Sequence, residues 1–279
     1  LSEESYYLIS AGAWTEYDSD YLHKSLSDSK FDEVSIYACT SQWGVFSIAG
    51  PKSRNFLKKL VVSEDPDKTL SNKQFPWLSY RNIEIGMCPV RALRVAYTGE
   101  LGWELHHPIE MQNYLLDILL SSGKEFNLKL VGARAQNWLR QEKSYKAFGS
   151  DLGRDAGPFE SNLSRFVDIN KNFLGKDALL KRKTDVSCVT LLIDGPKDMD
   201  PWGREALYNE TEEIMLGRLT SAGYSVHFKR SIGIGYVKSS FSEVGTKLRI
   251  KIDDAFWNAE IVRDSPYDPQ NERIIDRAQ

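Results

Sequence analysis

Cysteine and histidine, the residues that build disulfide frameworks and most protein metal sites, are scarce in this sequence. Its 279 residues include three cysteines and four histidines. Cys39, Cys88 and Cys188 are far apart and form no CxxC pair, which argues against a disulfide framework. His106 and His107 are adjacent, and the other two histidines stand alone, so no metal-ligand spacing appears. We expect no bound metal and a reducing compartment, either the bacterial cytoplasm or the mitochondrial matrix.

Long apolar runs and an excess of one charge are also missing. The longest apolar run, residues 114–120, is interrupted by Asp117 and is far shorter than the ~20 residues of a membrane helix. The 36 basic and 39 acidic residues leave a net charge of −3, which argues against nucleic-acid binding through bulk charge. We therefore expect neither a membrane nor a nucleic acid among the partners.

The sequence lacks the glycine motifs of nucleotide-binding proteins and serine hydrolases. Neither GxxxxGK[ST] nor GxSxG occurs. Gly233-Ile234-Gly235 lacks the third glycine of a dinucleotide fingerprint, and only short β runs surround it, whereas that fingerprint needs a strand followed by a helix. We expect this glycine pair to serve strand packing.

The first 183 residues alternate between strand-like and helix-like patterns. Residues 43–48 alternate as a strand does, whereas Phe56, Leu57 and Leu60 recur at helical spacing. Such alternation is typical of an α+β fold. Strands are expected over residues 34–39, 43–48, 83–87 and 89–97, and helices over 19–27, 53–60, 110–120, 132–146 and 176–183.

The pattern changes near residue 184. A length of 279 residues fits two domains better than one. From Val186 onward the sequence consists of short β runs separated by glycine-containing turns, which predicts a small β barrel or sandwich over residues 184–279. The expected strands are 189–193, 218–222, 232–237, 247–252 and 255–262.

The beginning of the sequence has no methionine and no leader-like segment. Residues 6–10 already have a strand-like pattern, so we expect the chain to be a piece of a longer protein. The sheet partners of this strand would then be missing, and the exposed edge would favour association.

Residues 94–105, RVAYTGELGWEL, are the most informative stretch. They combine the rings of Tyr97 and Trp103 with the carboxylates of Glu100 and Glu104 around a glycine-containing connection. A flat heterocycle with N–H donors on one edge needs an aromatic face and an anionic acceptor, which this set provides. From spacing alone, the more ordinary interpretation is a hairpin whose charged residues face water.

This stretch resembles the YTGExGxE segment of the folate-binding aminomethyltransferases, which include the T-protein of the glycine cleavage system. The resemblance to the folate-binding half of dimethylglycine and sarcosine dehydrogenases extends over nearly the whole chain. Further similar segments are residues 40–54, 75–76, 89–93, 132–152, 173–179, 219–224, 231–237 and 265–269.

The resemblance implies roles for three residues. In the family, the tyrosine that opens the motif and the glutamate that closes it contact the pterin, and these match Tyr97 and Glu104. A second tyrosine that lines the same pocket matches Tyr145. Independently, a carboxylate such as Glu104 can accept from both the ring N3–H and the exocyclic amine of a pterin. Tyr145 could instead be an ordinary core tyrosine, and we expect Glu100 to be a solvated turn carboxylate.

Two departures from the family pattern limit what the resemblance implies. Gln136 stands where glycine-cleavage T-proteins have an arginine, and Arg134 lies more than half a helical turn away, so it is not assumed to substitute. The catalytic aspartate of the family would fall just upstream of Leu1. We therefore expect no catalytic residue in this chain.

The resemblance implies the tetrahydrofolate-binding part of a dimethylglycine or sarcosine dehydrogenase-like protein that accepts a one-carbon unit from an amine. The implied partners are folate, a small methylated amine, and a flavin-binding part or another subunit that carries FAD. Two alternatives remain open, a regulatory subunit like that of pyruvate dehydrogenase phosphatase and a folate-binding accessory protein of iron–sulfur assembly. An upstream aspartate and flavin-binding motif would favour the enzyme.

Overall fold

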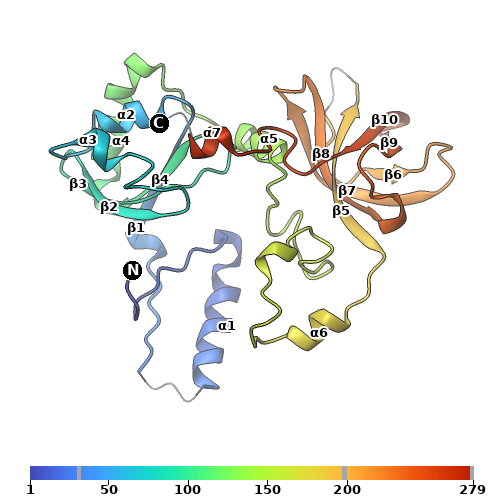
Figure 1. Cartoon of the computed structure of the whole chain (residues 1–279), viewed down its shortest axis with the longest axis horizontal. Coiled ribbons are helices and arrows are strands. Elements are labelled where there is room, and N and C mark those ends of the chain that lie inside the picture. Colours follow the sequence, from blue (N-terminus) through green and yellow to red (C-terminus); the bar gives the residue numbers. More distant parts are fainter. Residues whose placement is uncertain (30–32, 197–199, 277–279) are drawn as a thin grey trace.

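A computed structural model of the chain describes residues 1–29, 33–196 and 200–276. Within these residues, a four-stranded antiparallel sheet with flanking helices is followed by a closed barrel (Figure 1). The predicted α+β fold with a C-terminal β domain is confirmed, and that domain is a barrel. The strand order of the sheet is β1-β4-β3-β2, with bounds β1 Trp43–Ala49, β2 Tyr80–Ile85, β3 Cys88–Leu93 and β4 Gly102–Pro108.

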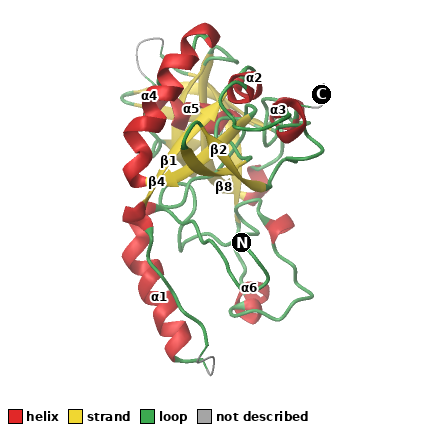
Figure 2. Ribbon diagram, turned by 90° about the vertical axis from the view of Figure 1, so that its left-hand side faces the viewer, coloured by secondary structure: helices red, strands yellow, loops and turns green. Residues whose placement is uncertain are grey.

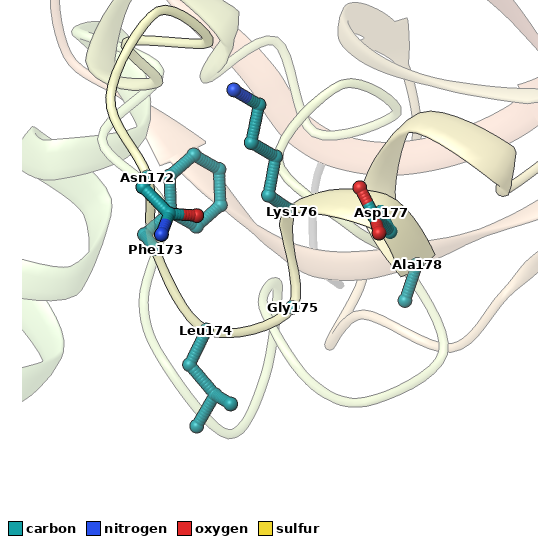
Figure 3. Close-up of a pocket in the computed structure, with 7 residues that line it drawn as sticks. All are labelled: Asn172, Phe173, Leu174, Gly175, Lys176, Asp177 and Ala178. Atoms are coloured by element: carbon teal, nitrogen blue, oxygen red, sulfur yellow. The ribbon is translucent and has the colours of Figure 1, made fainter.

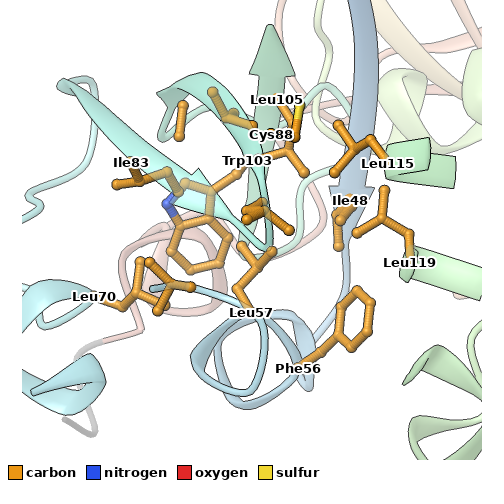
Figure 4. Close-up of a cluster of buried hydrophobic side chains, with 14 of the residues drawn as sticks. Ile48, Phe56, Leu57, Leu70, Ile83, Cys88, Trp103, Leu105, Leu115 and Leu119 are labelled. Carbon is orange, nitrogen blue, oxygen red and sulfur yellow. The ribbon is translucent and has the colours of Figure 1, made fainter. Parts of the chain in front are cut away.

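One face of this sheet is covered by helices and forms the core of the first part. Helix α4 lies beside the sheet, and α2 lies near its end (Figure 2). The side chains of Leu57 from α2 and Leu115 from α4 meet Trp103 and Leu105 from β4, and all four are fully buried (Figure 4). Burying one such aliphatic side chain contributes about 1.5–3 kcal/mol. The helices are α1 Thr15–Ser27, α2 Ser53–Lys58, α3 Pro66–Thr69, α4 Gln112–Gly123, α5 Ala133–Glu142, α6 Lys176–Lys181 and α7 Glu272–Ile275.

The other face of the sheet carries the polar residues of the motif. Successive side chains of a strand point to opposite faces, so Glu104 and His106 of β4 lie opposite to Trp103 and Leu105. Arg91 of β3 is the register partner of His106 and lies on the same face. This face is covered by a few N-terminal residues, described below, rather than by the core helices.

The barrel closes in the order β10-β5-β8-β7-β6-β9. Gly235 lies in β8, and a Cβ there would lie 2.5 Å from the carbonyl oxygen of Arg218 in β7. The glycine pair at 233 and 235 therefore serves close strand packing, as the sequence predicted. The barrel strands are β5 Val186–Asp194, β6 Ala206–Tyr208, β7 Met215–Ser225, β8 Arg230–Lys238, β9 Lys247–Ile252 and β10 Ala255–Val262.

Three sequence predictions about strands are wrong. Residues 6–10 and 34–39 form no strand, and residues 94–97 are irregular, so the strand expected over 89–97 ends at Leu93. β3 and β4 still pair antiparallel, as in a hairpin, and residues 94–101 form the loop between them. A β-prone segment forms a strand only where a neighbouring strand pairs with its backbone groups. Tyr6 and Tyr37 instead stay 83% and 84% exposed. The predicted sheet edge beside residues 6–10 is wrong for the same reason.

Helix α5 and the end of the chain connect the sheet to the barrel. Trp138 of α5 packs directly on β7, where a Cβ at Gly223 would lie 2.1 Å from its ring. After β10 the chain returns to the first part and ends near α7 (Figure 1). We call residues 265–276 the C-terminal strap. Arg54 of α2 pairs with Asp276 of the strap at 3.1 Å, and Arg94 donates to the carbonyl oxygen of Ile275 at 2.7 Å.

Among the described residues no helix is long and apolar enough to cross a membrane. In the same residues, no three His, Cys, Asp or Glu side chains stand together in a way that could hold a metal ion.

Candidate functional site

Glu104 lies on the polar face of the sheet with one carboxylate oxygen unused. Its Oε2 is 3.2 Å from Nε2 of His106, and its side chain is 30% exposed. Its Oε1 accepts no hydrogen bond from the described residues. An ionised carboxylate has about four lone-pair positions and can only accept. Glu104 can therefore receive further N–H donors from a ligand.

Tyr97 and Tyr145 lie together. Their rings are nearly parallel, at 10°, with centroids 5.9 Å apart. The hydroxyl of Tyr97 donates to the carbonyl oxygen of Lys146 at 3.1 Å. Burial raises the pKa of both phenols, so both stay neutral at physiological pH. The structure thus joins two of the three predicted residues, whereas no hydrogen bond in the described chain links Glu104 to either tyrosine.

A buried ion pair holds the backbone of Tyr145 in place. Arg140 of α5 donates to the carbonyl oxygen of Tyr145 at 2.7 Å and to Asp151 at 2.6 Å. It also donates to the hydroxyl of Ser221 in β7 at 2.7 Å. The side chains of Arg140 and Asp151 are 2% and 0% exposed. The position of Tyr145 therefore depends on the contact between α5 and the barrel.

Lys143 connects the motif turn to the C-terminal strap. Its Nζ donates to the carbonyl oxygen of Asp268 and to Oδ1 of Asn271, both at 2.7 Å. Burial lowers the pKa of this amine. Gly99 has a φ of +80°, and a Cβ there would lie 2.5 Å from Cγ of Lys143. The first glycine of the motif is required both by the turn and by the lysine packed on it.

The prediction that Glu100 is a solvated carboxylate is wrong. Glu100 accepts a hydrogen bond from the hydroxyl of Tyr267 in the C-terminal strap. Arg273 of α7 lies 3.4 Å away, and the Glu100 side chain is only 20% exposed. Burial and the hydrogen bond to Glu100 raise the pKa of Tyr267. Glu100 therefore joins the motif to the strap instead of facing water.

The sequence reasoning missed several residues that position this site. Arg140 and Glu142 of α5, and Lys143 just after its end, were noted only as part of a similar segment. All three are buried, which the sequence does not show. Glu142 accepts from the hydroxyl of Ser225 in the barrel. No sequence signal indicated that Tyr7 contributes to the site. Its segment, residues 6–10, was predicted to be a strand.

Arg134, two residues before Gln136, contacts two tryptophan rings. Arg134 lies between Trp138 and Trp202, with its guanidinium carbon 5.3 Å from each ring centroid. The guanidinium of Arg134 is therefore engaged by these two rings, and its not substituting for the family's arginine stays a prediction.

Two shallow hollows lie elsewhere on the surface. One, of about 690 Å³, is lined by residues 172–178 at the start of α6 (Figure 3). The other, of about 370 Å³, lies along the sheet strands and includes Trp43 and Arg91. Neither is lined by the three predicted residues Tyr97, Glu104 and Tyr145.

The fold and the motif can now be compared with known proteins. The family model of the GCVT N-terminal domain matches residues 1–171, and that of the glycine cleavage T-protein C-terminal barrel domain matches residues 187–268. The chain belongs to the glycine cleavage T-protein family. The predicted resemblance is confirmed.

Relatives of this T-protein family member include enzymes of two kinds. Mitochondrial dimethylglycine dehydrogenase of Mus musculus is 34% identical over 92% of this chain, which spans only 29% of that protein. An aminomethyltransferase of Caldanaerobacter subterraneus subsp. tengcongensis is 29% identical over 92% of this chain and 67% of that protein. The chain is thus an aminomethyltransferase-like region related to the dehydrogenases.

A solved structure supports the fold independently. The crystal structure of glycine cleavage system aminomethyltransferase T from Bartonella henselae matches with a TM-score of 0.73 at 20% identity. The match covers 90% of this chain and 66% of that one. The chain therefore has the T-protein fold across both the sheet part and the barrel.

Proposed function

We propose that this chain is the tetrahydrofolate-binding part of a dimethylglycine or sarcosine dehydrogenase-like protein. In this role it accepts a one-carbon unit from a secondary or tertiary amine and forms 5,10-methylenetetrahydrofolate. The observation that carries the proposal is Glu104, an acceptor-only side chain on the polar face of the sheet within the family motif. Its Oε1 accepts no hydrogen bond from residues 1–29, 33–196 or 200–276. Membership of the T-protein family supports the same ligand.

The residues present fit a reduced pterin. The pterin edge presents a ring N–H and an exocyclic amine, and a carboxylate can accept from both in one plane. The paired rings of Tyr97 and Tyr145 offer an apolar surface. The neutral hydroxyl of Tyr145 can donate, whereas that of Tyr97 already donates to Lys146. Glu104 would hold the pterin edge, and the two tyrosines would contact the flat ring system.

The proposed chemistry divides between folate and the protein. When bound, tetrahydrofolate supplies the two nitrogens that receive the one-carbon unit. The residues of this chain bind and orient the folate, which favours transfer by proximity. We assign no catalytic residue to this chain, and we assign amine oxidation by FAD to another part of the longer protein or to another subunit. The amine substrate is expected to be small and methylated.

We also propose a division of the chain near residue 184. Residues 1–183 would form the folate-binding part, and residues 184–279 the barrel domain. The two family matches, which end at residue 171 and begin at residue 187, support this division. Relatives include mitochondrial and bacterial proteins, so location in the mitochondrial matrix or the bacterial cytoplasm stays a prediction.

Replacing Glu104 with glutamine tests the proposed function. The variant keeps the shape of the side chain but presents an amide donor toward the donors of the pterin. Losing one charge-assisted bond and opposing two donors should cost about 2–4 kcal/mol, or roughly 30- to 1000-fold in affinity. The measurement is a calorimetric titration of the chain with tetrahydrofolate.

The matched control is Glu260→Gln, the same change at an exposed position of β10 in the barrel. A solvated carboxylate of this kind should change the affinity by less than about threefold. Wild-type chain that binds no tetrahydrofolate, or a Glu104→Gln variant that binds as tightly as wild type, would show that the proposed function is wrong. Binding without transfer in the full-length protein would favour a regulatory or accessory role.

A further inference from the structure

We propose that His106 and Tyr7 are positioning residues that hold the Glu104 carboxylate in its ligand-binding orientation. The inference rests on the proposed function, because it takes Glu104 as the pterin acceptor. The three side chains form one hydrogen-bonded row. The hydroxyl of Tyr7 is 3.1 Å from Nδ1 of His106, and Nε2 of His106 is 3.2 Å from Oε2 of Glu104.

The strand places His106 and Glu104 side by side. They are two residues apart on β4 and therefore share a face of the sheet. Glu104 is flanked by Ser47 of β1, and His106 by Arg91 of β3. Because the strands on both sides fix the backbone of β4, the distance between the imidazole and the carboxylate is set by the sheet.

The N-terminal residues cover His106 although it lies on the face opposite to the core. His106 is only 2% exposed. The ring of Tyr7 meets the imidazole edge-on, with centroids 5.6 Å apart. The guanidinium of Arg91 lies over the rings of Tyr7 and Trp43, at 4.5 and 4.8 Å. The imidazole is thus held by packing on several sides, whereas Glu104 remains partly open to solvent.

The chemistry of the three side chains also defines which atom donates and which accepts in each hydrogen bond of the row. An ionised Glu104 can only accept, so Nε2 of His106 must carry the hydrogen. In the neutral imidazole Nδ1 is then the acceptor, and the Tyr7 hydroxyl donates to it. Burial raises the pKa of Tyr7, with a further contribution from Cys39, so this hydroxyl remains a donor. The guanidinium of Arg91, which lies over the Tyr7 ring, acts on the pKa of Tyr7 in the opposite direction and lowers it, but burial has the larger effect.

The row leaves Glu104 prepared for a ligand. His106 uses one lone-pair position of Oε2, while Oε1 accepts nothing from the described chain. A carboxylate rotated to an arbitrary angle would have to be ordered when the ligand binds, which weakens binding. Holding the carboxylate before binding removes that cost.

The neighbouring histidine shows that the arrangement is specific to one position. His107 points to the opposite face, where its Nδ1 lies 2.9 Å from the carbonyl oxygen of Leu105. Its ring stacks on Phe46 with centroids 4.9 Å apart. His107 is therefore a core residue, and of the two adjacent histidines it is His106 that bonds to Glu104.

The test is calorimetric titration of the 279-residue chain with tetrahydrofolate. His106→Leu removes the donor and should weaken binding about 5- to 30-fold. His106→Gln can place an amide N–H near the position of Nε2 and should bind within about threefold of wild type. Tyr7→Phe keeps the ring over Arg91 and should weaken binding about two- to fivefold.

Two further variants separate positioning from a general structural effect. His23→Leu, on an exposed position of α1, is the matched control and should bind as wild type does. In a Glu104→Gln background, His106→Leu should cause little additional loss, because its partner is already altered. Thermal unfolding of each variant shows whether a loss of affinity reflects a loss of folding. If His106→Leu does not fold, His106→Gln remains informative.

The outcomes distinguish this proposal from the proposed function. If Glu104→Gln weakens binding but His106→Leu does not, the positioning role is wrong and the proposed function stands. The positioning role is also wrong if leucine and glutamine at position 106 weaken binding equally, or if the losses at 104 and 106 are additive. If wild type fails to bind, or Glu104→Gln has no effect, the proposed function fails and the positioning role with it.

Discussion

Replacing Asp151 with alanine is expected to lower the free energy of unfolding by about 3–5 kcal/mol. The Asp151 side chain is fully buried and accepts from Arg140 at 2.6 Å and from the Ala147 amide at 2.9 Å. It also accepts from the hydroxyls of Thr220 and Ser221 in the barrel, each at 2.6 Å. The variant would leave the Arg140 guanidinium buried without its counter-charge.

The size of the effect follows from this loss of the counter-charge. In a chain of this size each 1 kcal/mol lowers the midpoint of thermal unfolding by about 2–4 °C, so a decrease of roughly 6–20 °C is expected. Urea denaturation, followed by tryptophan fluorescence, gives the free energy directly. The matched control is Asp194→Ala. Asp194 pairs with Arg230 at 3.3 Å, with side chains 56% and 34% exposed, and should cost at most about 1 kcal/mol.

A second variant tests the reason for the effect. Replacing Arg140 with methionine and Asp151 with leucine removes both buried charges, and it should recover a large part of the stability lost in Asp151→Ala. If Asp151→Ala costs no more than the Asp194 control, the ion pair does not hold α5 against the barrel. If the double variant is no more stable than Asp151→Ala, the loss arises from the hydroxyl contacts and not from the unpaired arginine.

Two further predictions concern the motif turn and the barrel. Gly99→Ala should destabilise the chain by about 1–3 kcal/mol in urea denaturation, because of its positive φ and the adjacent Lys143, whereas Gly12→Ala, with open space around it, should not. Burial raises the pKa of Tyr236 to about 12, so the stability it contributes is complete below pH ~10 and is lost as pH rises toward 12. Tyr236→Phe should therefore reduce the fall in stability measured between pH 9.5 and 11.5, and an unchanged pH dependence would contradict this.

The barrel could be predicted from sequence because its β runs follow one another closely and are separated by glycine-containing turns. The five predicted strands correspond to β5, β7, β8, β9 and β10, with ends that differ by up to three residues. The strand β6, Ala206–Tyr208, was missed because three residues with one buried side chain, Leu207, give no periodic signal. It is recognised only by its pairing with β7 and β9.

The secondary structure of the N-terminal third was less predictable because β propensity describes only the preference of a segment by itself. Residues 6–10 and 34–39 have the composition of strands, but strand formation depends on a partner elsewhere in the chain. The segment at 6–10 supplies Tyr7 to the polar face of the sheet instead. Its side chain therefore contributes to the candidate site, although its predicted secondary structure was wrong.

At the candidate site, the family resemblance indicated residues whose contacts could not be predicted from their spacing in the sequence. The rings of Tyr97 and Tyr145, 48 positions apart in the sequence, lie together, whereas their common ligand pocket stays a prediction. Glu100 was misinterpreted because its partner, Tyr267, lies 167 residues away. A turn carboxylate looks solvated in sequence until the strap that returns to it is known.

The alternation of β4 explains how one short segment serves packing and binding together. Trp103, Leu105 and His107 point into the core, so the strand cannot shift by one residue without exposing its largest buried side chains. The same constraint fixes Glu104 and His106 on the opposite face. A substitution that weakens the core side of β4 should therefore also disorder the carboxylate, whereas a substitution at Glu104 should leave the core intact. Without ligand, substitutions on the core side of β4 should therefore lower both stability and affinity, whereas substitutions at Glu104 should lower affinity alone.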